Sequence, residues 1–314
     1  MANSRLHSHI GTFRQMELLV TVYDTGSINK AAEKLHLTQP TISMQLKKMA
    51  DAIGMPLYNK VGRKLVFTDA GLILVQSARE ILDSFSRLDM KLADLRGFKS
   101  GTLKISVVTT SKYFIPHLLG PFCKRYPNVD IQLKIGNREQ IIERLRSSLD
   151  DFCVFSHAPQ NMDICTLDFL PNPLVAIASE QHPLASQEKI TLAELEKYPF
   201  IMREQGSGTR NLIENFMKEH KISLNARMTI DSNEAIKHSV AEDLGISILS
   251  KHTLAFDEIA GIKHLEVEGM PIQCRWQLVY PSNKRLSVIA EAFLSYLNQG
   301  EGLDSLKARI GDMS

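Results

Sequence analysis

Residues 26–43 read GSINKAAEKLHLTQPTIS, and this stretch decides how the N-terminal part of the chain folds. Gly26 ends a preceding helix, and Ser27 is a good N-cap for a short helix with one apolar face. After a three-residue turn, Thr38 caps a third helix that carries Pro40 in its first turn, where the missing N–H costs nothing. Two short helices joined in this way form the geometry that enters a DNA major groove.

The face of the third helix that lies opposite its apolar stripe carries short hydrogen-bonding and cationic side chains. Gln, Ser and Thr can reach base edges, whereas Lys and Arg are better placed to hold phosphates. Ser27, at a helix N-terminus, can contact a phosphate as well as cap its helix, although capping alone also accounts for Ser27 and Thr38. The predicted DNA-binding residues are Ser27, Thr38, Gln39, Pro40, Thr41, Ser43, Lys47, Arg63 and Lys64.

Residues 58–68 predict a tight hairpin beside this helix, with a basic turn at 61–64 before the alternating strand Leu65-Val66-Phe67. Residues 30–64 hold seven Lys and Arg against two acidic residues, a net charge of +5, although the whole chain carries only +2. Such a concentration of positive charge is typical of a phosphate-backbone contact. A helical bundle with a surface hairpin is the alternative, but charge, caps and hairpin together favour a winged helix-turn-helix.

A long helix is predicted from residue 68 to about residue 96. Steps of 4, 3, 4, 3, 4 and 3 separate its apolar positions, a period of 3.5 residues that is typical of a coiled coil. We therefore predict a homodimer through this helix, which would present two recognition helices to two half-sites. The apolar positions are Leu74, Ala78, Ile81, Phe85, Leu88, Leu92 and Leu95.

Strands and helices alternate after a polar joint at residues 97–101. The βαβαβ pattern over residues 103–155 has near-continuous apolar strands, which indicates a parallel sheet buried on both faces. A second alternating set follows over residues 174–249, and we predict two small α/β lobes with a cleft between them. Strands near 263–267 and 273–280 and a helix over 286–297 should return the chain to the first lobe.

The chain is too long to fold around a single hydrophobic core, and the predicted fold class is α/β with several domains. A winged helix-turn-helix is expected over residues 1–67, a linker and dimerisation helix over 68–97, lobe I over 98–164 plus 266–300, lobe II over 165–265, and a loosely attached tail over 301–314.

The composition, with 44% hydrophobic and 23% charged residues, is that of an ordinary soluble globular protein. The first twelve residues lack the apolar run of a signal peptide, and no window approaches the roughly 18 apolar residues that span a bilayer. We therefore expect a cytoplasmic protein with no membrane partner. The scattered Cys123, Cys153, Cys165 and Cys274 lack metal-ligand spacing and are expected to be buried thiols, with a redox pair formed by folding as the alternative.

Four polar segments of the predicted lobes fall just after strands, at the edge where open α/β sheets bind ligands. Gly206-Ser207-Gly208-Thr209 precedes a helix and supplies free backbone N–H groups and the positive end of a dipole, with Arg203 and Arg210 nearby. This combination suits an anionic metabolite, although a plain helix cap is the alternative. It is not a P-loop, because no GK[ST] follows.

His157 either lines the same cleft or is a surface histidine in a turn. The predicted effector-binding residues are Thr109, Thr110, Ser111, Asn137, Arg138, His157, Arg203, Gly206, Ser207, Gly208, Thr209, Arg210, Asn233 and Glu234. No arrangement of nucleophile, base and acid, no paired carboxylates and no metal cluster stands out, so neither catalysis nor a cofactor is expected.

The run from Gly26 to Ser43, with Leu57-Tyr58, Gly62-Arg63-Lys64 and Gly71, resembles the winged helix-turn-helix of LysR-type transcriptional regulators. This resemblance extends over roughly residues 10–300. Residues 110–116, 136–140 and 203–210 further resemble the CbbR-like subfamily, which regulates carbon-fixation operons. The resemblance implies a two-lobed effector domain of the periplasmic-binding-protein type, with operator DNA, a small metabolite and a second copy of the chain as partners. RNA polymerase is a further candidate partner, and dimers are expected to pair into tetramers.

We therefore predict a sequence-specific DNA-binding transcription regulator that is not an enzyme. An effector that binds the cleft better in one arrangement of the lobes would shift the angle of the paired DNA-binding heads. One alternative is a solute-binding protein for transport, against which the basic N-terminal segment argues. The other is an α/β enzyme with an appended DNA-binding domain, for which the sequence offers no catalytic residues.

Overall fold

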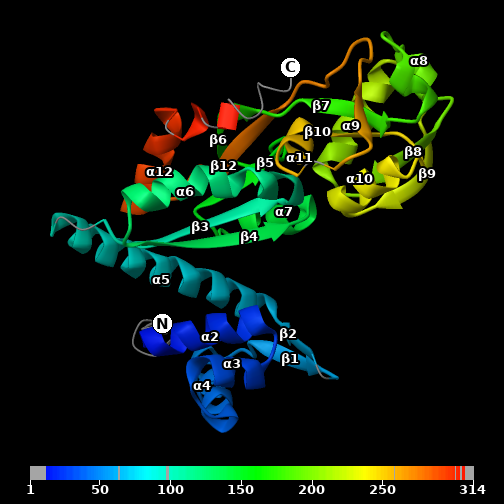
Figure 1. Cartoon of the computed structure of the whole chain (residues 1–314). Coiled ribbons are helices and arrows are strands. Elements are labelled where there is room, and N and C mark those ends of the chain that lie inside the picture. Colours follow the sequence, from blue (N-terminus) through cyan, green and yellow to red (C-terminus); the bar gives the residue numbers. More distant parts are fainter. Residues whose placement is uncertain are drawn as a thin grey trace. The chain divides into compact units, whose positions relative to one another are not determined.

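The computed structural model describes residues 12–62, 64–96, 99–257, 259–300, 302–304 and 306–307. The chain divides between Leu92 and Ala93 into two compact units, which we call the head and the regulatory half (Figure 1).

The described part of the head, from residue 12 onward, consists of three helices, a hairpin and most of a long helix. Its second and third helices begin where the sequence predicts, because the side chains of Ser27 and Thr38 accept hydrogen bonds from the backbone N–H groups of Lys30 and Thr41, at 3.4 Å each. The elements are α2 (Phe13–Thr25), α3 (Ile28–Leu35), α4 (Gln39–Ile53), β1 (Tyr58–Val61), β2 (Lys64–Phe67) and α5 (Asp69–Leu95). A shared apolar core between these elements confirms the helix-turn-helix with its hairpin wing.

The start of α5 packs tightly against the loop before the hairpin. The Thr68 hydroxyl donates a hydrogen bond to the carbonyl oxygen of Pro56 at 2.6 Å and accepts one from the backbone N–H of Gly71 at 3.1 Å. A Cβ atom at Gly71 would lie only 2.0 Å from the carbonyl oxygen of Leu57, so this close approach requires glycine.

Lobe I of the regulatory half is a five-stranded sheet with helices packed on it. Its strands lie in the order β4-β3-β5-β12-β6, with β3, β4 and β5 parallel and β12 antiparallel to both of its neighbours. Phe122 and Phe293 pack two of its helices together, with ring centroids 5.0 Å apart. Lobe I contains β3 (Gly101–Val108), η1 (Thr109–Tyr113), α6 (Ile115–Arg125), β4 (Val129–Gly136), α7 (Arg138–Arg146), β5 (Phe152–Phe155), β6 (Ile164–Pro171), β12 (Arg275–Pro281) and α12 (Val288–Asn298).

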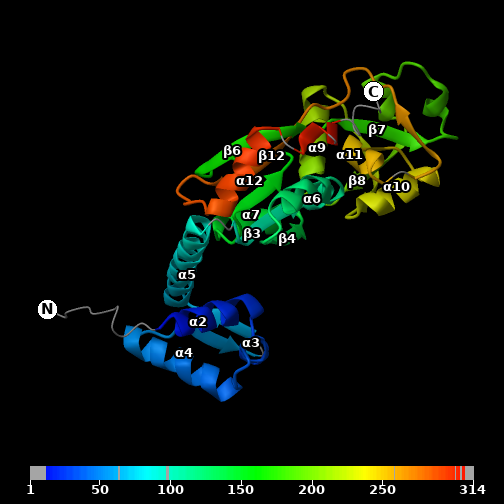
Figure 2. The same cartoon turned by 60° about the vertical axis from the view of Figure 1, so that its left-hand side comes forward.

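Lobe II repeats this plan. A parallel bridge between Phe200 and Ile246 joins its two small sheets, which gives the order β9-β8-β10-β7-β11. Strand β7 is antiparallel to both of its neighbours, as β12 is in lobe I. Lobe II contains β7 (Leu174–Ser179), η2 (Pro183–Ser186), α8 (Leu192–Leu195), β8 (Pro199–Arg203), α9 (Gly208–Glu219), β9 (Asn225–Ile230), α10 (Asn233–Ala241), β10 (Ser247–Ser250), α11 (Lys251–Ala255) and β11 (Ile262–Leu265). Figures 1 and 2 show the two lobes side by side.

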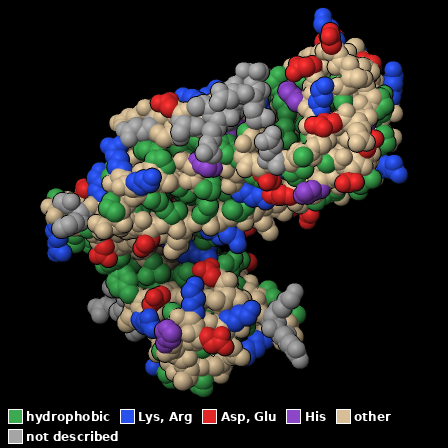
Figure 3. Space-filling view, in the orientation of Figure 1, with side chains coloured by type: hydrophobic (Ala, Val, Ile, Leu, Met, Phe, Trp, Pro, Cys, Tyr) green, Lys and Arg blue, Asp and Glu red, His purple; other side chains and the backbone are tan. Residues whose placement is uncertain are grey.

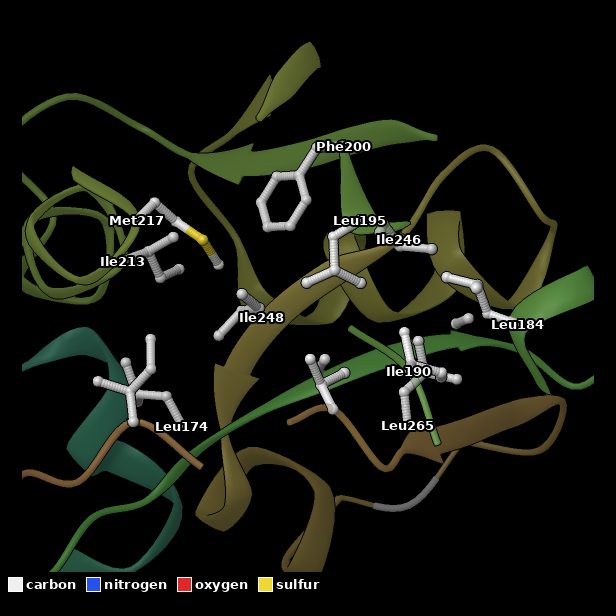
Figure 4. Close-up of a cluster of buried hydrophobic side chains, with 14 of the residues drawn as sticks. Leu174, Leu184, Ile190, Leu195, Phe200, Ile213, Met217, Ile246, Ile248 and Leu265 are labelled. Carbon is white, nitrogen blue, oxygen red and sulfur yellow. The ribbon is translucent and has the colours of Figure 1, made fainter. Parts of the chain in front are cut away.

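The sheet of lobe II is buried on both faces, as its near-continuous apolar strands predict. Along β7, Leu174, Ala176 and Ala178 belong to one apolar cluster, whereas Val175 and Ile177 belong to the cluster on the other face. Figure 4 shows the first cluster, in which Leu174, Phe200, Ile213 and Leu265 converge from strands and a helix. The α/β fold with two lobes is therefore confirmed.

The chain crosses between the lobes twice, after β6 and before β12. At these crossings Asn172 N–H donates a hydrogen bond to the carbonyl oxygen of Cys274 at 2.8 Å, and the Cys274 thiol donates to the carbonyl oxygen of Asn172 at 2.7 Å. Residues 165–171, which the sequence analysis placed in lobe II, pair in the sheet of lobe I. Conversely β11, which was expected to return to lobe I, pairs with β7 in lobe II.

Two further expectations need correction. The residues after 300 were expected to form a loosely attached tail, but among the described ones Leu303 is 4% exposed and Leu306 is 0% exposed, because a short helical turn directs both inward. Leu74 and Ala78, the first two positions of the predicted coiled-coil seam, pack into the core of the head.

Candidate DNA-binding face and effector cleft

The first turns of α4 present a polar surface that is already organised within the head. The Gln39 amide donates a hydrogen bond to the Ser43 hydroxyl at 2.7 Å, and the hydroxyls of Thr38 and Thr41 lie 2.8 Å apart. Beneath this surface, Ile42 and its apolar neighbours on the helix are buried in the head core. The predicted contact residues are therefore held together at the N-terminal end of one helix.

The remaining predicted DNA-binding residues differ in their exposure, and two of them are not fully described. Pro40 and Lys47 are exposed on α4, and Ser27 is half-buried at the start of α3. Arg63 lies outside the described residues, and the side chain of Lys64 is likewise not described. Lys60, which the sequence analysis counted only as charge, is exposed on the hairpin strand β1.

The rest of the predicted seam is an exposed apolar stripe on α5. Ile81, Phe85, Leu88, Leu92 and Leu95 each keep at least 38% of their surface exposed. Figure 3 shows hydrophobic side chains gathered over α5. Such a stripe at heptad spacing is typical of a helix that pairs with another helix.

The cleft of the regulatory half lies where β3, β4, β5 and β8 end. It lies between the two lobes, and its cavity volume is about 10 Å³. The residues that line it are Val108, Thr109, Thr110, Asn137, Arg138, Ser156, Arg203, Glu204, Ser207, Gly208 and Thr209. Eight of the fourteen predicted effector residues belong to this lining, contributed by both lobes.

Arg203 is a buried cation of the cleft whose guanidinium is held by several hydrogen bonds. It is 3% exposed, and its Nη1 donates hydrogen bonds to the side-chain oxygen of Asn233 at 2.6 Å and to the Thr110 hydroxyl at 3.5 Å. Its Nε and Nη2 donate to the two carboxylate oxygens of Glu204, at 2.7 and 3.0 Å. Asn233 is fully buried and does not line the cleft, so it positions Arg203 rather than the ligand.

Arg138 enters the cleft from the other lobe, at the start of α7. Its Nη1 donates a hydrogen bond to the carbonyl oxygen of His157 at 2.5 Å, and its guanidinium lies 5.4 Å from the ring centre of Phe155. Burial lowers the pKa of Arg138, but a guanidinium stays protonated in proteins. The helix cap Asn137 precedes it and accepts a hydrogen bond from the Gln140 backbone at 2.9 Å.

The N-terminus of α9 faces the same cleft from lobe II. Ser207 makes no side-chain capping bond, and the first N–H groups of a helix have no partner within it. A Cβ atom at Gly208 would lie 3.1 Å from the Ser156 hydroxyl oxygen, so glycine lets the two lobes approach closely here. Two arginines and a helix N-terminus make the cleft suitable for an anion.

A second polar contact joins the lobes beside the cleft. The carboxylate of Glu234 in lobe II accepts a hydrogen bond from the Tyr113 hydroxyl at 2.8 Å and pairs with the Lys112 ammonium at 2.7 Å. Burial alone would raise the pKa of Glu234, but these partners lower it to about 2. Glu234 thus holds the lobes together and does not line the cleft.

Four other predicted effector residues lie outside the lining. The Ser111 hydroxyl is buried and donates to the carbonyl oxygen of Val108 at 2.6 Å, and the His157 side chain is exposed. Arg210 pairs with Glu214 at 2.6 Å. Gly206, at a φ of +81°, lies next to the Glu139 side chain. Their assignment to the effector site stays a prediction.

Sequence reasoning missed two polar residues of the lining, Ser156 and Glu204. Ser156 directly follows β5, so the rule that found the other strand ends could have found it too. Glu204 directly follows β8 and carried the same signal, but a carboxylate is not expected in an anion site.

The cysteines show no sign of a redox pair within the described residues, all four being free thiols. Burial raises the pKa of both Cys153 and Cys274 to about 12, so these two thiols are poor nucleophiles. No helix in the described part of the chain is both long and apolar enough to cross a membrane.

Comparisons with known proteins agree with this architecture. Residues 13–72 match the model for bacterial regulatory helix-turn-helix proteins of the lysR family, and residues 96–301 match the LysR substrate-binding domain. The transcriptional activator CmpR of Synechocystis is 48% identical over 91% of this chain and 94% of its own length. The transcriptional regulator CbbR of Rhodospirillum rubrum is 37% identical over 90% and 95%.

Two solved structures extend the comparison. The regulatory domain of Synechocystis CcmR, solved in complex with 2-PG, is 42% identical and covers 63% of this chain and 96% of its own, with a TM-score of 0.61. Full-length CbnR, solved in complex with its target DNA, shares the fold at 20% identity and a TM-score of 0.67, over 92% of this chain and 100% of its own. The helix-turn-helix, the two-lobed domain and these relatives together show that the chain belongs to the LysR family of bacterial regulatory proteins.

Proposed function

We propose that this LysR-family regulator reads operator DNA with the first turns of α4 and controls that binding through a small phosphorylated acid in the cleft. The observation that carries the proposal is the pair of arginines, Arg138 and Arg203, which approach one cleft from different lobes. A ligand held by both would favour one arrangement of the lobes over others.

The DNA half of the proposal rests on α4. Gln39 and Ser43 are bonded to each other on the surface, so both can exchange this bond for a base edge. Gln39→Ala should weaken binding to the DNA upstream of the chain's own gene by about tenfold, since one good base contact contributes roughly 1–3 kcal/mol. Fluorescence anisotropy of labelled DNA measures the change.

Gln45→Ala is the matched control, because Gln45 lies on the same helix but accepts a hydrogen bond from Gln15 of α2 at 2.8 Å. It should leave operator affinity within about twofold of the parent. Equal operator affinity for the Gln39→Ala variant and the parent would overturn the assignment of α4 to base recognition.

The effector half rests on the charge of the cleft and on the relatives. The CcmR domain binds 2-phosphoglycolate, a dianionic phosphate joined to a carboxylate. Arg138 and Arg203 could each hold one end of such a molecule, with the N-terminus of α9 adding its dipole. Arg138→Gln should raise the dissociation constant of 2-phosphoglycolate at least about tenfold, because charged hydrogen bonds contribute roughly 1.5–3 kcal/mol.

Isothermal titration of the full chain measures this constant. Arg146→Gln is the control, since Arg146 is exposed on the same helix and lies outside the cleft lining. If 2-phosphoglycolate fails to bind the parent protein, the proposed effector class is wrong while the DNA-binding proposal stands.

We further infer that the chain acts as a dimer through the α5 stripe, and as a tetramer if dimers pair, on operators of carbon-fixation genes in the cytoplasm. The relatives named as RuBisCO operon regulators support the target, at 37–40% identity. Effector-dependent binding to a RuBisCO operon promoter, but not to unrelated DNA of equal length, tests it.

A further inference from the structure

The guanidinium of Arg203 could bind an anion, but the pair of N–H donors best suited to this already has a partner. The Nε and Nη2 edge of a guanidinium is a flat fork that matches the two oxygens of a carboxylate or a phosphate. In this structure the carboxylate of Glu204 takes both bonds of that edge, at 2.7 and 3.0 Å. An anionic ligand would need the same two donors.

Arg203 has little freedom to offer another edge. Its Nη1 is bonded to Asn233 and Thr110, and the side chain is 3% exposed. Glu204, in contrast, keeps 21% of its side chain exposed at the cleft. If one partner of the pair moves, Glu204 can reach water whereas Arg203 stays in place.

The charges of the lining show what this pair does to the cleft. Arg203 and Arg138 are its two cations, and Glu204 is its one acidic group among the described lining residues. Arg138 donates its hydrogen bond to a carbonyl oxygen, not to a carboxylate. While Glu204 neutralises Arg203, the cleft therefore offers a single uncompensated guanidinium.

On this basis, and resting on the proposed effector function, we propose that Glu204 competes with the effector for Arg203 and thereby lowers the affinity of the cleft for acids that need this guanidinium. Because Glu204 is joined to Arg203 by the chain itself, a ligand must displace the Glu204 carboxylate before its own carboxylate or phosphate can take the same two donors. This displacement costs the same free energy for every ligand that takes the fork, so it lowers all their affinities by one factor. Glu204 thus sets how tightly the cleft can hold an anionic effector.

The test compares two ligands on three full-length proteins by isothermal titration. The ligands are 2-phosphoglycolate and diglycolate, in which a carboxymethyl group replaces the phosphate. The proteins are the parent, Glu204→Gln and, as matched control, Glu214→Gln, which removes a carboxylate from the Arg210 pair outside the cleft lining.

Glu204→Gln should tighten the binding of both ligands by at least about tenfold, because neither ligand then has to displace the Glu204 carboxylate from Arg203. A tenfold change corresponds to about 1.4 kcal/mol, roughly one charge-assisted hydrogen bond. The Glu214→Gln protein should keep the affinities and the preference of the parent.

Weaker binding of both ligands to Glu204→Gln would overturn the proposal, because Glu204 would then position Arg203 for the ligand. Tighter binding of one ligand alone would also overturn it, since a competitor for Arg203 must weaken the binding of both ligands. If 2-phosphoglycolate binds the parent and Glu204→Gln equally, the inference fails and the proposed effector function stands. If neither ligand binds any of the three proteins, both fail.

Discussion

The polar residues of α4 and those of the cleft are organised in opposite ways. On α4 the side chains lie at the surface and bond to neighbours one turn away on the same helix, as Gln39 does with Ser43. In the cleft, Arg203, Asn233 and Thr110 are buried, and their bonds join segments 30 to 123 residues apart in the chain. The first arrangement leaves hydrogen bonds ready for exchange with DNA, whereas the second fixes cations in a defined geometry.

This difference predicts that a substitution in the cleft costs folding stability as well as binding, whereas a substitution of an exposed α4 side chain such as Gln39 costs binding alone. Trp276 makes the prediction measurable, because it is the single tryptophan of the chain and is buried in the regulatory half. Its fluorescence therefore follows the unfolding of that half and not of the head.

The largest effect is expected from Arg203→Met. Removing this cation leaves Asn233 and Thr110 without their partner and Glu204 without its counter-charge, which should lower the free energy of unfolding by about 3–5 kcal/mol. Urea titration followed by Trp276 fluorescence measures the loss. Arg275→Met is the control and should cost less than about 1 kcal/mol, since Arg275 and its partner Asp168 are 52% and 46% exposed. Equal losses would refute the distinction between buried and surface pairs.

His252, at the junction of the lobes, should make the regulatory half sensitive to acid. Burial, only partly offset by a hydrogen bond with the carbonyl oxygen of Pro171, lowers its pKa from 6.5 to about 4. The unfolded chain then binds more protons than the folded one between these values, so stability falls as pH drops through this window. Between pH 7 and pH 5 the loss should be about 2 kcal/mol.

Urea titrations of the parent and of His252→Gln at both pH values test this expectation. The variant should lose most of that difference, while His157→Gln, with its exposed side chain, should keep it. An unchanged pH dependence in His252→Gln would show that other groups cause the loss.

On α5, Leu88→Asp should weaken dimerisation at least about tenfold, because it places a charge in an apolar helix seam. Sedimentation velocity over a range of protein concentrations measures the dissociation constant. Ser86→Asp, exposed two residues away and off the seam, should leave it unchanged. A dimer that resists the Leu88 change would exclude α5 as the main contact.

The smallest effect is expected in the head. Thr38→Ala removes the N-cap of α4 and should destabilise that helix by about 1 kcal/mol. Hydrogen exchange of the α4 amides measures the change, and Ser43→Ala in the second turn is the control. Exchange that is equally slow in the parent and in Thr38→Ala would mean that packing alone holds the helix start.

The sequence predicted the head in more detail than the cleft, because caps and apolar stripes act between residues a few positions apart. Three residues illustrate this, because each can cap a helix with its own side chain. These are Ser27, Thr38 and Thr68, and each accepts the hydrogen bond from a backbone N–H that its type and position predict. Eight of the residues that the strand-end rule selected also line one cleft, and their role in effector binding stays a prediction.

What the sequence could not reveal depends on partners distant in the chain. Glu234 looked like a ligand residue, yet its partners Lys112 and Tyr113 lie more than 100 residues away. Strand β6 was missed because most of its residues are half-buried or exposed and show no continuous apolar run. Only its pairing with β12 reveals it as a strand. Leu74 and Ala78 fit the heptad, but only the fold shows that the head core already uses them.

The bonds between Asn172 and Cys274 have a mechanical consequence. Two antiparallel chain segments connect the lobes, and they are bonded to each other at Asn172 and Cys274 and again at Leu174 and Ile272. Two connections held side by side in this way resist sliding and twisting of one lobe past the other more than bending at the crossing. We therefore expect a rearrangement that starts in the cleft to bend the molecule at this crossing, which moves the far end of each lobe farther than the residues near Arg203.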